Sequence, residues 1–302
     1  MTLGWQSRLA LGALRGLPLN ALSRTAGRAA SLQLPAPLQR ALIRGFAAAV
    51  GVDWNEVRDP IDSFPSLQAF FTRALAPGVR PRDESEGAFL APCDGSWGAS
   101  GRVHQGTLLQ VKGRHYPLAD LLGSAADATA LEGGPYATLY LSPRDYHRFH
   151  APLDAHVSGA RHLPGCLWPV NRLGVEGVAR LFAVNERICI SLSPRDRPEA
   201  QLLIVAVGAT MVGSVRVVFD RELGTNTAAS QRLERRYPEP LPLARGDELG
   251  RFEFGSTLVV VASPGWLELD VRAPGSPLRV GTRIGSVLSV GAAPTGQSGG
   301  SP

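Results

Sequence analysis

The chain has few cysteines and no long uncharged run near its start. Only three of its 302 residues are cysteines, Cys93, Cys166 and Cys189, and no two of them form a Cys-x-x-Cys pair. We therefore expect neither a disulfide framework nor a regular zinc site, and a reducing compartment suits this sequence. The first 50 residues contain no uncharged stretch of about 18 residues, so a membrane-spanning helix is not expected there.

Acidic residues are also absent from the first 50 positions. These positions hold six arginines and no Asp, Glu or Lys, whereas the whole chain has a net charge of +5. Arg8 and Arg15 lie on one face of a predicted helix, and Leu3, Leu14 and Leu17 lie on another. A basic amphipathic helix on an anionic membrane is one interpretation. Two alternatives stay open, namely packing of these leucines on the following domain and an organellar transit peptide.

The rest of the chain is rich in glycine and proline, with 34 and 24 residues in total. This composition favours short strands joined by turns. We predict strands at 88–90, 108–111, 137–141, 187–192, 202–207, 211–219, 258–261 and 267–271, and helical segments at 37–49, 66–71 and 117–122. The polar stretch from Arg221 to Glu239 lacks periodicity and is predicted to be a loop.

These elements predict an α+β protein with a mainly antiparallel β sandwich or barrel-like core and amphipathic helices before it. We divide the chain into a helical, membrane-associating segment at 1–75, a β-rich catalytic domain at 76–290 and a disordered tail at 291–302. Two pairs of segments resemble each other. Arg245–Phe252 resembles Val280–Val287, and Ala91–Gly95 resembles Ala151–Ala155, which suits a sandwich built from two related halves.

Three places carry candidate chemistry. Asp94 lies in a Pro-Cys-Asp-Gly turn, where it could simply cap its own backbone. His147 and His150 lie three residues apart between prolines, without a third ligand at helical spacing, so no metal is expected. The third place is Gly255-Ser256, directly before the apolar run 258–262. This Gly-Ser pair could be an ordinary turn into a buried strand.

An acid, a histidine and a serine together can activate a hydroxyl nucleophile. The surroundings of Ser256 lack the Gly-x-Ser-x-Gly pattern of a conventional serine hydrolase. A serine that follows glycine at the entrance to a strand can instead attack the carbonyl group behind it and cut its own chain.

A series of short motifs runs along the chain in a fixed order. The motifs are Phe70-Phe71-Thr72-Arg73, Val79-Arg80-Pro81, Pro92-Cys93-Asp94-Gly95, Val111-Lys112-Gly113 with Tyr116, Tyr140 to His150, Pro164-Gly165, Val170-Asn171, Leu181-Phe182, Asn185-Glu186-Arg187, Val207 to Ser214, Gly250-Arg251-Phe252 and Gly255-Ser256-Thr257. Their order is specific, although no single motif is, and it resembles that of the bacterial phosphatidylserine decarboxylases of the membrane-bound, proenzyme type. The family usually has leucine where this chain has Phe254, and glycine is common at the Asp154-Ala155 pair.

The resemblance implies maturation by self-cleavage between Gly255 and Ser256. In it, Asp94 orients His150, His150 deprotonates Ser256, and the serine becomes a covalent pyruvoyl cofactor at the start of a 256–302 α chain, paired with a 1–255 β chain. His147 would supply a proton during decarboxylation of phosphatidylserine to phosphatidylethanolamine, since an imidazole titrates near neutral pH.

The resemblance also implies a peripheral enzyme on the cytoplasmic side of the cell membrane, formed by its own α and β chains as a pair or as a higher oligomer. Its partner would be an anionic membrane surface, and no nucleic acid is expected. Two alternatives stay open. One is a pyruvoyl-dependent decarboxylase of a free amino acid, and the other is a lipoyl-like β-sandwich binding module.

Overall fold

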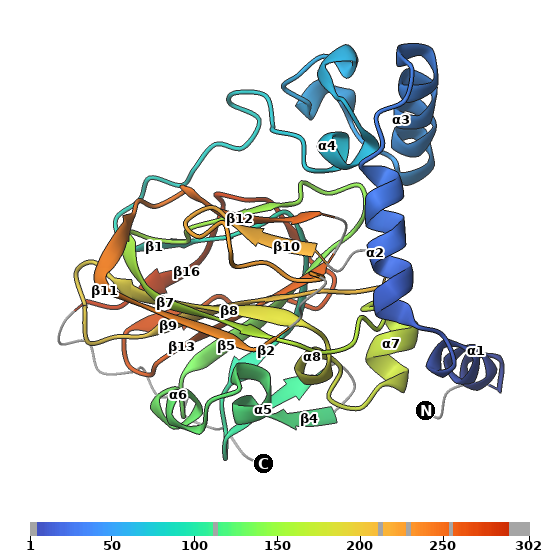
Figure 1. The fold of residues 1–302 in the computed structure, drawn as a ribbon. Coiled ribbons are helices and arrows are strands. Elements are labelled where there is room, and N and C mark those ends of the chain that lie inside the picture. Colours follow the sequence, from blue (N-terminus) through green and yellow to red (C-terminus); the bar gives the residue numbers. More distant parts are fainter. Residues whose placement is uncertain (1–4, 111–113, 211–213, 228–230, 254–255, 290–302) are drawn as a thin grey trace.

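The strands form one large open sheet and three small ones. A computed structural model describes residues 5–110, 114–210, 214–227, 231–253 and 256–289 (Figure 1). The large sheet has the strand order β11-β7-β8-β9-β13-β5-β2-β15, so its two edges are formed by different strands and it is not closed into a barrel. These strands span Leu233–Leu243, Ala155–Leu163, Arg187–Pro194, Leu202–Val207, Ser256–Ala262, Pro135–Leu141, Gly95–Arg102 and Pro277–Leu278. The predicted α+β class is confirmed.

The small sheets lie beside the large one and are antiparallel as well. One has the order β1-β16-β14, another β10-β12-β6, and β3 and β4 form a hairpin. Their bounds are Ala88–Leu90, Arg283–Val287, Leu267–Leu269, Ser214–Val217, Glu248–Glu253, Arg148–His150, Thr107–Gln110 and Arg114–Pro117. Part of the strand predicted at 211–219 falls on residues 211–213, and part of that at 108–111 on residue 111, both outside the described residues.

Successive side chains along each strand of the large sheet point to opposite faces, and each face packs against its own core. On β13, Leu258 and Val260 join a core that includes Phe149 and Phe252 of the small sheets. Val259 and Val261 join the opposite core, which includes residues of the short helices α5 (Leu118–Leu122), α6 (Ala125–Ala130), α7 (Arg172–Gly177) and α8 (Leu181–Val184). The strand that begins at Ser256 therefore runs through the centre of the sandwich.

The first part of the chain is helical. It contains α1 (Trp5–Arg15), α2 (Leu19–Ala30), α3 (Ala36–Val50), η1 (Trp54–Glu56), η2 (Ile61–Ser63) and α4 (Leu67–Phe71). Of these, α2 and the two short 3₁₀ helices η1 and η2 lay outside the predicted segments. Figure 1 shows α2 along one side of the sheets, with α1 near one end and α3 near the other. A separate small core joins α3 and α4 through Ile43, Ala47 and Phe70. Within the described residues no helix combines the length and hydropathy needed to cross a membrane.

The predicted loop at 221–239 was wrong. Its second half belongs to β11, which pairs with β7 at the edge of the large sheet. Leu233, Arg235 and Tyr237 are half-buried and alternate with exposed Glu234 and Arg236. Burial therefore alternates along β11 with the period of two that is typical of a strand, but charged residues lie on both of its faces. The prolines later in β11 are tolerated because it is an edge strand.

The two pairs of similar segments form two equivalent turns. Ala91 donates its amide to Thr282 and accepts from Gly281, while Ala151 donates its amide to Asp247 and accepts from Gly246, all at 2.7–3.0 Å. Gly281 and Gly246 have φ of 86° and 87°, a conformation that favours glycine. The predicted duplication is therefore present in the backbone. The boundary at residue 75 remains a prediction, and the tail at 291–302 lies outside the described residues.

Candidate active site

Ser256 is the first residue of the central strand β13. Its backbone pairs with Leu141 at the end of β5, and the next residue, Thr257, pairs with Tyr140 on one side and Val207 on the other. Gly255, Phe254 and the side chain of Ser256 lie outside the described residues. The backbone register alone therefore places the predicted cleavage site where three neighbouring strands begin or end.

Two buried hydroxyl groups next to this position lack hydrogen-bond partners among the described residues. They are Thr257 Oγ1 and the Tyr140 hydroxyl, on cross-strand neighbours. Burial raises the pKa of Tyr140 to about 12, so its hydroxyl stays protonated. Buried polar groups are normally paired, and an unpaired cluster indicates a site that accepts another polar group.

His147 is the predicted histidine nearest to Ser256 in backbone register. Its carbonyl accepts a hydrogen bond from the Phe252 amide at 2.9 Å, four residues before Ser256. The side chain is fully buried, and its Nδ1 donates to the Asp145 carbonyl at 2.8 Å. Nε2 is buried and has no partner among the described residues.

Burial lowers the pKa of His147 to about 3, and the charge of Arg73 acts in the same direction. The imidazole is therefore neutral at pH 7 in this structure, with its free electron pair on Nε2. The expectation of titration near neutral pH does not describe this residue here, because the expectation assumed a solvated ring.

His150 lies further from Ser256 in register, since it pairs with Glu248 on β12. Its Nδ1 donates to the Gly246 carbonyl at 2.9 Å, so Nε2 accepts from the Tyr146 hydroxyl at 2.9 Å. Burial lowers the pKa of His150 as well. The ring lines a cavity of about 340 Å³ together with the arginine side chains of Arg58, Arg80, Arg82 and Arg148.

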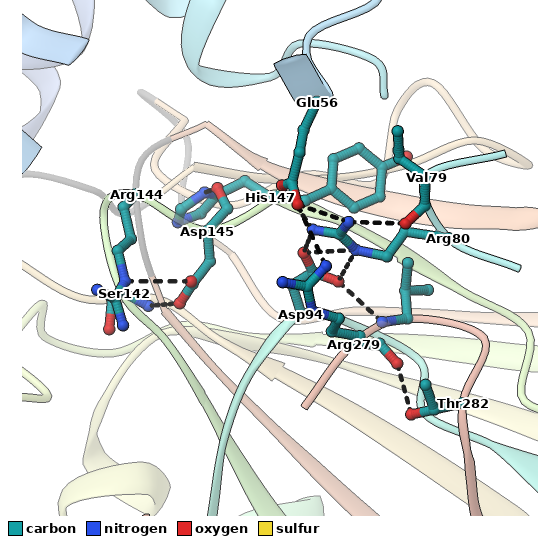
Figure 2. A network of polar contacts seen from close by, with 12 residues as sticks. Glu56, Val79, Arg80, Asp94, Ser142, Arg144, Asp145, His147, Arg279 and Thr282 are labelled. Carbon is teal, nitrogen blue, oxygen red and sulfur yellow. Dashed lines mark hydrogen bonds and ion pairs between the residues drawn. The ribbon is translucent and has the colours of Figure 1, made fainter. Parts of the chain in front are cut away.

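Asp94 lies in a buried ion network that Figure 2 shows from close by. Arg80 donates to both Asp94 carboxylate oxygens at 2.6–3.1 Å and to both oxygens of Glu56 at 2.7 and 2.9 Å. Asp94 also accepts the Val280 amide at 2.8 Å, and Arg279 reaches Glu56 at 3.2 Å. Hydrogen bonds from Arg80 lower the pKa of Glu56, and its two carboxylate partners raise the pKa of Arg80.

The structure brings Asp94 and His150 close through their backbones. The His150 amide donates to the carbonyl of Pro92, two residues before Asp94, at 2.7 Å. The Asp94 side chain binds Arg80, and the His150 side chain binds Gly246 and Tyr146. No hydrogen bond joins the Asp94 and His150 side chains among the described contacts, and the contacts of the Ser256 side chain lie outside the described residues, so the Asp94, His150 and Ser256 arrangement stays a prediction.

Comparison with known proteins places these features in one family. The family model for phosphatidylserine decarboxylase matches residues 67–286. A phosphatidylserine decarboxylase proenzyme of Anaeromyxobacter sp. is 44% identical over 280 residues, covering 92% of this chain and 98% of that protein. Those of Myxococcus xanthus and Azotobacter vinelandii are 39% and 40% identical, covering 90% and 89% of this chain and 95% and 94% of theirs.

The chain belongs to the phosphatidylserine decarboxylase family. For a decarboxylase of this family, sequence reasoning missed several residues that hold the candidate site. Arg73, Arg80 and Tyr146 stood inside the quoted motifs without an assigned role, and Glu56 lay outside them. The motifs themselves contain the two arginines and could have identified them. The partner of Glu56, in contrast, is Arg80, 24 positions later, and only the fold brings the two together.

Asp145 was also missed. Its carboxylate accepts the Ser142 amide at 2.6 Å and closes the turn that leads from β5 to His147 (Figure 2). Burial raises the pKa of Asp145, and the nearby charge of Asp94 acts in the same direction. A carboxyl group whose pKa is raised by burial and by a neighbouring charge is typical of functional sites in enzymes. Within the described residues, no group of three or more His, Cys, Asp or Glu side chains is placed to bind a metal.

Proposed function

We propose that this chain is a self-processing decarboxylase that converts phosphatidylserine to phosphatidylethanolamine and CO2. The observation that carries the proposal is the position of Ser256. It opens the central strand of the sandwich, next to the unpartnered Thr257 and Tyr140 hydroxyls, in a chain of this family. The family match favours neither a free amino acid as substrate nor a lipoyl-like binding module.

Maturation would be a rearrangement of the chain itself. The Ser256 oxygen attacks the Gly255 carbonyl carbon, the peptide C–N bond breaks, and an ester joins the two residues while the amine takes up a proton. A base then removes the Ser256 α-proton, the Gly255 carboxylate leaves, and hydrolysis of the remaining dehydroalanine releases ammonia and gives a pyruvoyl group. The products are a 1–255 β chain and a 256–302 α chain.

We assign the base that activates Ser256 to His150 and its orientation to Asp94. The lone pair of His150 Nε2 is available once the Tyr146 hydroxyl moves away, since Nδ1 is held by Gly246. Asp94 and His150 lie on adjacent backbone segments, which makes a side-chain contact between them possible after a rearrangement of the Arg80 network.

The residues around Ser256 fit a small polar group covalently attached there. Thr257 Oγ1 and the Tyr140 hydroxyl are buried donor groups on the residue after Ser256 and on its cross-strand neighbour. A pyruvoyl group supplies an electron sink for the loss of a carboxylate. His147 Nε2 would take up a proton from the ammonium group of the substrate and then give it to the carbon that loses the carboxylate, because Nδ1 is committed to the Asp145 carbonyl.

The helical first segment is proposed to bind the membrane surface that contains the substrate. Nine of the eleven exposed large apolar side chains of the described residues lie before residue 55, among them Trp5, Leu9, Leu38 and Leu42. Six arginines accompany them, which suits an anionic lipid surface. We propose a peripheral position on the cytoplasmic side of the cell membrane.

Intact mass and activity measurements on four chains test this function. Purified wild type should contain two chains split between Gly255 and Ser256, and it should release CO2 from phosphatidylserine vesicles but not from free serine. Ser256→Ala and His150→Ala should remain single chains of 32 kDa. His147→Ala should be cut and turn over slowly. An active single chain would contradict the proposal, and an uncut His147 variant beside a normally cut His150 variant would reverse the two histidine roles.

A further inference from the structure

We infer that Arg73 is a positioning residue that holds His147 in the one orientation and tautomer the reaction needs. The inference rests on the proposed function, because it concerns the histidine assigned to proton transfer. Arg73 lies in the helical first segment, whereas His147 lies in the β-rich part of the chain.

Three consecutive residues at the end of α4, from Phe71 to Arg73, contact the segment that carries His147. Ser66 is the N-cap of this helix and its Oγ accepts the Ala69 amide, while Phe71 is the last helical residue. The Phe71 ring lies 4.0 Å from the His147 ring, centroid to centroid. The Thr72 carbonyl accepts Arg148 Nε at 3.0 Å, and Arg73 Nη2 donates to the Arg144 carbonyl at 2.7 Å. The end of α4 therefore braces the chain on both sides of His147.

One carbonyl oxygen links Arg73 directly to the histidine. The Asp145 carbonyl accepts Arg73 Nη2 at 3.3 Å and His147 Nδ1 at 2.8 Å. A carbonyl oxygen has two lone pairs and cannot donate, so Nδ1 must bear the proton in this contact. Arg73 thereby fixes the acceptor that determines the tautomer, and the tautomer leaves Nε2 as the reactive atom.

The surroundings of Arg73 are unusual for a residue with only a packing role. Its side chain is 4% exposed, and its Nε and Nη1 have no hydrogen-bond partner among the described residues. No carboxylate of the described residues lies within ion-pair distance, although the guanidinium lies 5.4 Å from the Phe70 ring centre. Burying a charge in this way costs stability, which hydrophobic packing alone would avoid.

The positive charge also opposes protonation of the histidine. Arg73 lowers the pKa of His147 in addition to the larger effect of burial. Burial lowers the pKa of Arg73 itself, whereas the charges of Asp94, Glu56 and Asp145 act in the opposite direction and favour its charged form. A neutral ring with a free Nε2 is therefore maintained by both the geometry and the charge.

The test compares Arg73→Gln and Arg73→Lys with wild type in the full chain. We expect Arg73→Gln to be cut, to lose about 10- to 100-fold in kcat on phosphatidylserine vesicles, and to keep its KM within about twofold. Selective ¹⁵N labelling of histidine should show the Nδ1–H form of His147 in wild type and a mixture of tautomers in Arg73→Gln. Arg73→Lys keeps the charge with one donor group, so it should restore part of kcat and of the Nδ1–H population.

Arg187→Gln is the matched control. Arg187 is also 4% exposed and, among the described residues, donates only to the backbone carbonyls of Asp120, Leu121 and Asn185. Its loss should lower the melting temperature in a similar way but leave kcat per cut chain and the His147 tautomer unchanged.

The inference would be overturned if both Arg73 variants had the kcat and the His147 tautomer of wild type. It would also be overturned if Arg187→Gln lost as much kcat as Arg73→Gln. If Arg73→Gln does not fold, wild-type values in Arg73→Lys would overturn it. A wild type that is inactive on phosphatidylserine would instead refute the proposed function, while the tautomer measurement would still test Arg73.

Discussion

Asp94 and Asp154 occupy equivalent positions in two turns that make the same backbone hydrogen bonds. Asp94 accepts the amide of Val280 at 2.8 Å, and Asp154 accepts the amide of Arg245 at 2.9 Å. The two turns also hold each other. The Leu90 amide donates to the Pro152 carbonyl, and the His150 amide donates to the Pro92 carbonyl.

What differs is the environment outside the repeated segments. The Asp94 side chain is 6% exposed and paired at 2.6 Å with Arg80, which is itself bound to Glu56. The Asp154 side chain is 45% exposed and 3.6 Å from Arg195. Conversely, His150 occupies in the second half the position that Leu90 occupies in the first. The two turns therefore share a backbone arrangement, but only the turn of Asp94 is joined to buried charged groups from the first 80 residues, namely Arg80 and Glu56.

The largest difference should appear between Asp94→Asn and Asp154→Asn. Asp94→Asn leaves Arg80 buried beside Glu56 alone, and breaking a buried pair typically costs about 3–5 kcal/mol. We expect this variant to stay uncut, as judged by intact mass, and to melt well below wild type. Asp154→Asn should cut normally and lose less than about 1 kcal/mol, because its pair is exposed.

This pair of variants could also break the comparison. Equal cutting in both would mean that Asp94 acts only as the cap of its turn, as Asp154 does. To separate folding from chemistry, the melting temperatures should be measured in a Ser256→Ala background, where every chain remains in one piece.

Substitution of the two turn glycines should give a smaller and equal effect. Gly281 and Gly246 both have φ near +86°, where an alanine costs about 1–2 kcal/mol. An added Cβ would lie 3.3 Å from the Pro81 carbonyl oxygen at Gly281, and 2.8 Å from the flexible Arg82 side chain at Gly246. We expect Gly281→Ala and Gly246→Ala to lower the melting temperature by similar amounts in the Ser256→Ala background. A large effect at only one position would show that the turns are not energetically equivalent.

The sequence alone supported the strands and the duplicated turns better than the chemistry at them. Apolar runs such as 202–207 and 258–261 predicted strands, because such residues must be buried in a two-layer core. The edge strand β11 was missed because charges lie on both its faces, and α2 because Pro18 separates it from the first helix.

The pairing within the site depended on distant contacts. His147 and His150 look alike in the sequence, yet Phe71, 76 positions earlier, covers His147, while His150 lines a cavity. The apparent partner of Asp94 was a histidine, but Arg80 and the Val280 amide occupy its carboxylate. Local patterns identify which residues can do chemistry, whereas long-range packing decides which of them meet.

The smallest expected effect is that of Glu56→Gln on the pH dependence of the free energy of unfolding. Hydrogen bonds from Arg80 lower the pKa of Glu56 below its ordinary value of 4.5, so the carboxylate form stabilises the fold. This contribution is present above pH 4.5 and is lost as the pH falls through the lowered pKa. Glu56→Gln should therefore lower the free energy of unfolding by less than about 1 kcal/mol at pH 7, and the difference from wild type should shrink as the pH falls below 4.5. Urea unfolding of the Ser256→Ala chain between pH 3 and about 7 measures it.

Glu84→Gln is the matched variant in the second turn. Glu84 pairs with Arg245 at 2.9 Å, but its side chain is 65% exposed, compared with 25% for Glu56. Solvent screens the more exposed pair, so this variant should change the free energy of unfolding by less than Glu56→Gln at pH 7. If both variants changed stability equally, the Arg80 network would be no stronger than a surface ion pair, and the contrast between the two turns would then rest on Asp94 alone.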